Sequence, residues 1–146
     1  MLKFKKNQFV GVGMLLVVAS SMVIYEKYTE KHKEQKFIVQ FERGLNLKKD
    51  QSQTLTKVAT KMFENNDYVA FVIGHTETQG NHNSNITLSE KRANIIKKLI
   101  VDKNIKPKRI KTNGSGGSKP LEKKTNESYR AYQSRLSRAT IILRSE

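Results

Sequence analysis

Residues 37–146 are predicted to form one α/β domain, an α+β two-layer sandwich with helices on one side of a small mixed sheet. Two observations lead to this prediction. Short runs of β-branched and aromatic residues alternate with segments of helical periodicity, in the order β-α-β-α-β-α-β. About 110 residues also suffice to bury a modest core. The chain has no cysteine, so this core has to hold without disulfides.

The first three elements follow from their apolar patterns. Residues 37–41 (FIVQF) are typical of a strand, because they are rich in β-branched and aromatic side chains. Asp50 is expected to start a helix, in a capping box completed by Gln53. The apolar stripe of this helix consists of Leu55, Val58, Ala59, Met62 and Phe63. Residues 68–73 form an apolar run bounded by Gly74, which predicts a buried central strand.

A second helix is expected after a long polar loop at 74–87. Residues 87–90 (TLSE) form another capping box, which places the start of the helix at this point. Its predicted apolar stripe consists of Leu88, Ile95, Ile96, Leu99 and Ile100. Pro107 ends the connection that follows, and residues 109–112 are expected to form the third strand.

The last part of the chain completes the pattern. Residues 113–118 (NGSGGS) are a turn-rich loop. The spacing of Tyr129, Tyr132 and Leu136 indicates a short third helix. Residues 139–143 (ATIIL) predict the final strand.

The N-terminal part has the features of a membrane-targeting segment. Residues 1–8 hold three lysines and are expected to stay in the cytoplasm, while the uncharged residues 9–25 reach the lower limit for a transmembrane helix. An uncleaved signal anchor would give a single-pass inner-membrane protein whose C-terminal domain lies in the periplasm. A cleaved signal peptide is the alternative, although the apolar residues 22–25 favour the anchor. Residues 26–36 form a polar linker that spans at most about 37 Å.

The charge of the chain narrows its possible partners. A formal net charge of +15 favours anionic partners such as lipid headgroups, wall polymers or nucleic acid. Nucleic acid is not expected, because the export signal argues against it and no basic helix face is interleaved with aromatic residues. No nucleophile–base pair stands out, so no enzyme is expected. His75, Glu77 and His82 match no standard zinc motif, and neither metal nor cofactor is expected.

Charged side chains follow the predicted central strand and recur on the second helix. Glu77 offers a carboxylate that can pair with an ammonium group. Arg92 offers a planar guanidinium that can bind a carboxylate through two parallel hydrogen bonds. Free N–H groups at a helix start also favour an anion. Together these groups suit a zwitterion of amino-acid type. From the spacing alone, the alternative is that Glu77 is a solvated loop acid and Arg92 a surface residue.

The same stretch forms a family motif. From residue 74 the chain reads G-H-T-E-x-x-G, and from residue 85 it reads N-x-x-L-S-E-K-R-A. This pattern resembles the OmpA C-terminal domain family, which includes the stator protein MotB and the lipoprotein Pal. Phe41 with Gly44 resembles the end of the family's first strand, and Arg138 resembles the second arginine of its closing N-R-R-V motif.

The resemblance implies an OmpA-like fold that binds peptidoglycan non-covalently through the peptide stem, whose diaminopimelate end is a zwitterion. In this reading Glu77 receives the ammonium group, Arg92 holds the carboxylate and Asn85 lines the pocket. The predicted peptidoglycan-binding residues are Thr76, Glu77, Asn85, Leu88, Arg92 and Arg138. Family members with a single N-terminal span often dimerise, so a homodimer is also expected.

Two departures from the family pattern leave a second function open. Glu77 replaces an aspartate, which moves the charge by about 1.5 Å. Residues 136–138 (LSR) lack the asparagine and the first arginine of the closing motif. The alternative function is therefore that of a structural component of a secretion, motor or envelope complex with a degenerate pocket. Other subunits of the complex would then be its partners.

Overall fold

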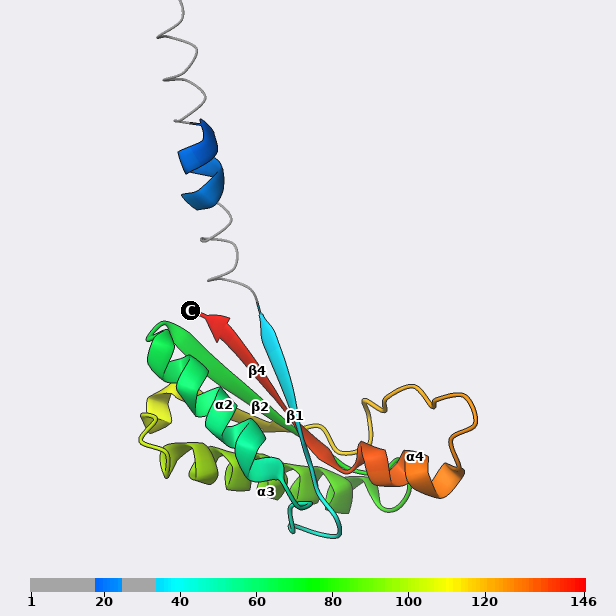
Figure 1. Cartoon of the computed structure of the whole chain (residues 1–146). Coiled ribbons are helices and arrows are strands. Elements are labelled where there is room, and N and C mark those ends of the chain that lie inside the picture. Colours follow the sequence, from blue (N-terminus) through cyan, green and yellow to red (C-terminus); the bar gives the residue numbers. More distant parts are fainter. Residues whose placement is uncertain (1–17, 25–33) are drawn as a thin grey trace, which may run out of the picture. The chain divides into compact units, whose positions relative to one another are not determined.

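The structure is a computed structural model that describes residues 18–24 and 34–146 (Figure 1). Residues 18–24 are helical and exposed, while the remainder of the predicted segment 9–25 lies outside the described residues, as do 1–8 and most of the linker. In the described part of the chain, no helix combines the length and apolar character needed to cross a bilayer. The chain divides into two units, Met1–Lys33 and Glu34–Glu146.

Glu34–Glu146 has the predicted order of elements, which confirms the α/β fold class. The elements are β1 (Gln35–Gln40), α2 (Gln51–Glu64), β2 (Tyr68–His75), α3 (His82–Val101), the 3₁₀ helix η1 (Pro107–Arg109), β3 (Ile110–Gly114), α4 (Tyr129–Leu136) and β4 (Arg138–Ser145). The four strands form one sheet in the order β1-β4-β2-β3. β4 runs antiparallel to both β1 and β2, whereas β2 and β3 are parallel, so the sheet is mixed as predicted.

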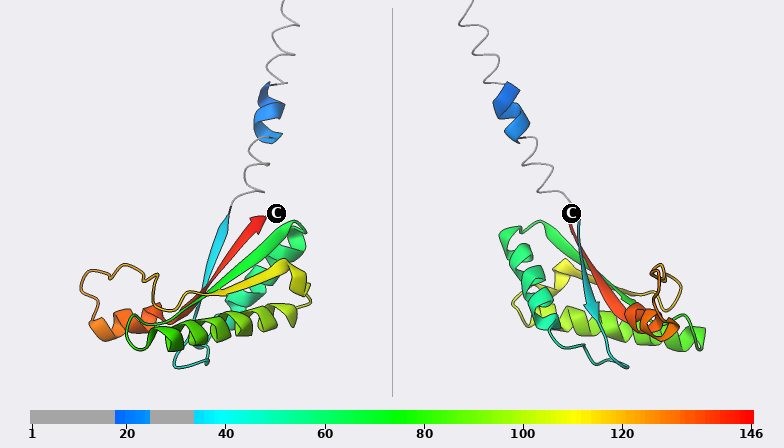
Figure 2. Two further views of the ribbon diagram at one scale, coloured as in Figure 1. Left: turned by 180° about the vertical axis from the view of Figure 1, so that it is seen from behind. Right: turned by 45° about the vertical axis from the view of Figure 1, so that its right-hand side comes forward.

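Helices α2 and α3 cover one face of this sheet (Figure 2). α3 lies against β2 and β3, and α2 lies against β1, while α4 lies beyond the end of the sheet. The buried core between the two layers contains Val39, Val72, Ile141, Met62 and Ile96, each with no exposed surface. The unit Glu34–Glu146 therefore has two layers. The opposite face of its sheet, called the open face below, is covered by neither α2 nor α3, although His75, Arg138 and Thr140 on it are buried.

The apolar stripe of α2 ends earlier than the sequence predicts. Leu55, Val58, Ala59 and Met62 are buried as expected, but Phe63 is 57% exposed. Because successive helical residues are about 100° apart, Phe63 lies beyond the edge of the stripe. The prediction that Phe63 belongs to the core is wrong.

The predicted capping box at Asp50 is also wrong. Asp50 is in the left-handed region, with φ of 65°, and its side chain makes no capping hydrogen bond. A capping box needs an extended N-cap residue, so this backbone conformation excludes it. The Gln51 side chain instead accepts a hydrogen bond at 3.0 Å from the backbone N–H of Gln40, which ties the start of α2 to β1.

Helix α3 begins at His82, well before the capping box predicted at residues 87–90. The N-cap is Asn81, whose side chain accepts a hydrogen bond from the backbone N–H of Ser84 at 3.0 Å. The polar residues before Thr87 therefore form the first turn of the helix, because a cap outside the predicted box satisfies its N–H groups. This start shortens the loop after β2 and places Arg92 in the third turn.

Two glycines let α3 lie close to the sheet. Gly74 and Gly114 are neighbours across β2 and β3. A Cβ atom at Gly74 would lie 1.8 Å from the backbone oxygen of Ser89, and one at Gly114 would lie 2.4 Å from Cγ of Glu90. The buried Ser89 hydroxyl in turn accepts a hydrogen bond from the backbone N–H of Gly116 at 2.9 Å. This close approach sets the distance between α3 and the sheet, and it thereby sets the position of Arg92.

Candidate functional site

A pocket of about 250 Å³ lies where α3 meets the loops after β1 and β2. Its lining residues are Glu42, Arg43, Gly44, Thr76, Glu77, Gln79, Asn85, Leu88, Arg92 and Ser137. The structure therefore brings together five of the six predicted site residues, and Arg138 is the exception. The volume falls just below the range of about 300–1,000 Å³ usual for small-molecule sites, so it suits an amino-acid-sized group.

Arg92 is the buried cation of this pocket, with only 2% of its surface exposed. Its Nε donates to the Gly44 carbonyl at 2.9 Å, and its Nη1 donates to the His75 carbonyl at 2.7 Å. The guanidinium carbon lies 5.0 Å from the centre of the Phe41 ring. These contacts fix the orientation of the guanidinium plane. The two hydrogen bonds use two of the five N–H groups of the guanidinium. Burial lowers the pKa of Arg92, and the negative charge of Glu77 opposes that shift.

Glu77 supplies negative charge to the same pocket. Its side chain is exposed, and among the ion pairs of the described residues none joins it to Arg92. The two opposite charges therefore line one pocket without neutralising each other by direct contact. This arrangement suits a ligand that carries both an ammonium group and a carboxylate.

The backbone around Glu77 is held from two sides. The N–H of Thr76 donates to the Gly116 carbonyl at 2.9 Å, and a Cβ atom at Gly117 would lie 2.5 Å from the Glu77 carbonyl oxygen. On the other side, the N–H of Thr78 donates to the side chain of Gln133 at 3.2 Å, and Gln133 returns a hydrogen bond to the Thr78 hydroxyl at 3.1 Å. Helix α4 and the loop after β3 thus position the backbone that carries Glu77.

Asn85 holds the loop that closes the pocket. Its Nδ2 donates to the Gln79 carbonyl at 2.9 Å, which ties the loop after β2 to the first turn of α3. The half-buried Leu88 contributes apolar surface beside it. Asn85 therefore shapes the pocket through the loop as well as lining it.

Arg138 does not line the pocket. It is buried and donates to the Leu136 carbonyl at 3.2 Å and to the Lys119 carbonyl at 3.0 Å. In the sheet it is paired with His75, on the open face. Burial, and secondarily the positive charge of Arg135, lowers the pKa of Arg138. This arginine connects β4 to the loop before α4.

His75 is buried beside these cations. Its Nε2 lies 3.3 Å from the Thr140 hydroxyl, and its Nδ1 has no hydrogen-bond partner. Burial lowers the pKa of His75 to about 4, with smaller contributions from the positive charges of Arg138, Lys119 and Lys36. The imidazole is therefore neutral at physiological pH.

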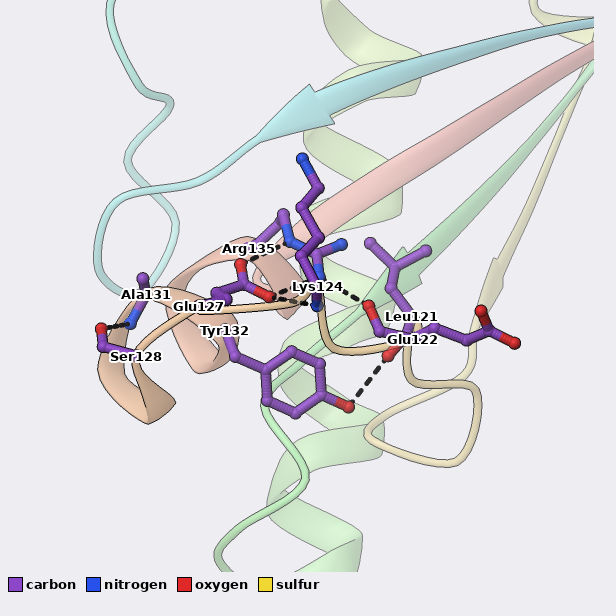
Figure 3. A network of polar contacts seen from close by, with 8 residues as sticks. All are labelled: Leu121, Glu122, Lys124, Glu127, Ser128, Ala131, Tyr132 and Arg135. Carbon is purple, nitrogen blue, oxygen red and sulfur yellow. Dashed lines mark hydrogen bonds and ion pairs between the residues drawn. The ribbon is translucent and has the colours of Figure 1, made fainter.

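A polar network fixes α4 and the loop before it (Figure 3). Arg135 holds both carboxylate oxygens of Glu127 at 2.8 Å and also donates to the Glu122 carbonyl at 2.6 Å. The Tyr132 hydroxyl donates to the Leu121 carbonyl at 2.9 Å. This network stabilises the helix that carries Gln133 and ends beside Ser137, the pocket residue next to Arg138.

Five of the ten residues that line the pocket were not predicted as site residues from the sequence. Glu42 and Arg43 come from the turn after β1, where the Glu42 N–H donates to the Asn46 carbonyl at 2.8 Å. Gln79 and Ser137 come from two further loops. The one signal for this wall was Phe41 with Gly44, which marked the strand end but not the side chains beside it.

The fold and the site together define a class of small sheet-and-helix domains with a charged pocket at a strand end. The sequence profile of the OmpA family matches residues 41–134, which is more than half of the chain. The chain belongs to the OmpA family.

The similar proteins agree with this assignment. The chain is 33% identical over 75 residues to the Escherichia coli (strain K12) protein described as "Probable lipoprotein YiaD"; the match covers 51% of this chain and 34% of that protein. It thus spans about a third of that relative. The peptidoglycan-associated lipoprotein from Burkholderia pseudomallei has the same fold, with a TM-score of 0.65 at 18% identity over 73% of this chain and 89% of that one. The C-terminal domain of Helicobacter pylori MotB gives 0.63 at 17% identity, over 75% and 85% of the two chains.

Proposed function

We propose that this domain binds peptidoglycan non-covalently through the peptide stem, in the pocket between Glu77 and Arg92. The observation that carries the proposal is that a buried guanidinium and an exposed carboxylate line one pocket without pairing with each other. A peptide-stem end with an ammonium group and a carboxylate can pair with both. Membership of the OmpA family supports the proposal, as does the same fold in a protein named as peptidoglycan-associated.

Each pocket residue has a separate task in this function. Arg92 presents free N–H groups to the ligand carboxylate, held in position by its bonds to two backbone carbonyls. Glu77 receives the ammonium group. Asn85 and Thr76 shape the loop beside the ligand, and Leu88 packs against its aliphatic part. These are binding roles, and no covalent step is involved.

Binding to peptidoglycan implies that the protein is located in the bacterial envelope. Residues 9–25 anchor it in the inner membrane, and the domain faces the periplasm. The partners are then peptidoglycan, the inner membrane and other subunits of an envelope complex, with a second copy of the chain forming a homodimer. The excess of lysine and arginine favours an anionic wall.

Sedimentation with purified peptidoglycan sacculi tests the pocket. The unit Glu34–Glu146 contains all strand pairings and the buried core, so it is used without the N-terminal segment. We expect wild type to sediment with the sacculi and Arg92→Ala to stay in solution. Glu77→Gln keeps the shape of the side chain and removes its charge, and we expect about 10- to 100-fold weaker binding, the size of one charge-assisted hydrogen bond.

Lys91→Ala is the matched control, because this exposed neighbour of Arg92 carries the same charge outside the pocket. Circular dichroism establishes that each variant is folded. If Glu77→Gln and Lys91→Ala bind as wild type does, the pocket does not hold the stem. The domain would then be a structural component of an envelope complex with a degenerate pocket.

A further inference from the structure

The face of the sheet opposite α2 and α3 has a regular arrangement of side chains. Because strand residues alternate between faces, the strand register identifies the residues on this open face. One row across all four strands consists of Lys36, Ile142, Phe71 and Lys111. The next row consists of Ile38, Thr140, Ile73 and Asn113.

The charged strand residues on the open face are all basic. Lys36 and Lys111 stand at its two edges, and Arg144 follows on β4. The Phe71 ring is flanked by two of these cations, with Cζ of Arg144 at 3.9 Å and Nζ of Lys111 at 5.1 Å from its centre. Lys111 is also paired with Glu146 at 2.6 Å, beyond the end of β4. The strand positions themselves carry no acidic residue on this face.

An apolar strip, formed by Ile38, Phe71, Ile73 and Ile142, lies beside the cations. Ile38 is 41% exposed. Phe71, Ile73 and Ile142 are half-buried, although α2 and α3 lie on the other face of the sheet (Figure 2). Four strands at about 4.8 Å spacing make a surface roughly 14 Å wide. Lysine and arginine beside partly exposed isoleucine and phenylalanine are typical of surfaces that meet a lipid headgroup layer.

We propose that this open sheet face docks on an anionic phospholipid surface, with Lys36 and Arg144 on the headgroups. The proposal rests on the envelope location given under the proposed function. The polar linker keeps the domain within about 37 Å of the anchor segment, so the local concentration of lipid is high. A second copy of the chain is a poorer occupant, because two faces of like charge repel each other.

Docking in this way leaves the wall-binding pocket accessible. The pocket is formed by α3 and by loops at the end of the sheet, whereas the docking residues lie on the strands of the opposite face. The two surfaces can therefore be disabled separately, and failure of one proposal can be distinguished from failure of the other.

Vesicle co-sedimentation tests the docking surface with the unit Glu34–Glu146. The probe is vesicles of phosphatidylglycerol and phosphatidylcholine in about equal amounts, compared with vesicles of phosphatidylcholine alone. We expect binding to the anionic vesicles, reduced roughly tenfold or more in the double variant Lys36→Glu/Arg144→Glu. The matched control, Lys57→Glu/Lys91→Glu, makes the same change of charge at exposed positions of α2 and α3. We expect it to retain most of the binding.

Ile38→Ser tests the apolar strip without changing any charge. We expect it to weaken binding to anionic vesicles while Arg92→Ala leaves that binding unchanged. Equal losses in the two double variants would overturn the proposal, since binding would then follow net charge alone. Absence of binding to anionic vesicles would also overturn it. Sacculus binding measured on the same variants reports on the pocket independently.

Discussion

At the residue scale, Glu77 is a longer side chain on a backbone that is held in place. It carries the charge about 1.5 Å further from the backbone than aspartate would. Its backbone is held by the Thr76–Gly116 hydrogen bond and by Gln133, so the extra length projects from a fixed point. Arg92 is held as firmly by two carbonyls. The separation between the two charges is therefore set by the scaffold and by the length of one side chain.

His75 makes stability depend on pH. In the unfolded chain its imidazole takes up a proton near pH 6.5, but in the folded domain it does so only near pH 4. Between these values the unfolded state binds more protons, so the free energy of unfolding falls as the pH is lowered. We expect a loss of up to about 3 kcal/mol from this residue by pH 4.

Urea unfolding of wild type and His75→Asn at several pH values from 7 to about 4 measures this effect. The variant should lose stability more gradually over the same range, because it has no imidazole to protonate. Parallel curves for the two proteins would show that other groups cause the acid sensitivity.

At the element scale, α4 acts as a support for the pocket without providing its charged groups. It lies beyond the end of the sheet and is fixed by the Arg135–Glu127 pair and by the cap at Ser128, which accepts from the Ala131 N–H at 3.2 Å (Figure 3). Through Gln133 it holds the loop that carries Glu77. Precise placement of a binding group depends on such supporting contacts.

We therefore expect Gln133→Ala to weaken binding to sacculi by about tenfold, because the Glu77 loop loses both hydrogen bonds to α4. Arg130→Ala, at an exposed position of the same helix, serves as the control and should bind as wild type. Unchanged binding of Gln133→Ala would mean that the contact of Gly117 with the loop is sufficient to place Glu77.

At the scale of the whole molecule, long-range attraction and pocket binding have different sensitivities to salt. Residues 37–146 carry about +11 of the formal charge, mostly on exposed lysines, and salt screens such charges efficiently. The guanidinium of Arg92 is buried and is screened much less.

We expect about 0.5 M NaCl to remove most non-specific attraction to sacculi while the difference between wild type and Arg92→Ala persists. Sedimentation at low and high salt measures both contributions. Complete loss of the difference at high salt would indicate that Arg92 acts as one more surface charge and that the pocket adds no specific contact.

The sequence by itself determined the order of the elements and most core residues, because helical stripes and strand alternation are short-range periodicities that a sequence displays directly. The charges of Glu77 and Arg92 suggested a zwitterion site, and the resemblance of their motif to a known family implied the other predicted pocket residues. The two capping boxes predicted from local sequence motifs were wrong, because tertiary contacts override such motifs. Asp50 has a left-handed backbone, and Asn81 caps α3 ahead of the predicted box.

Only the tertiary structure decided which distant segments meet. It inserted β4 between β1 and β2, which placed Arg138 on the open face and away from the pocket. It also brought Glu42 and Arg43 from the first loop to the pocket wall beside Arg92. Pairing between strands and contacts between loops depend on the packing of the whole chain, because the residues involved are far apart in the sequence and carry no common period.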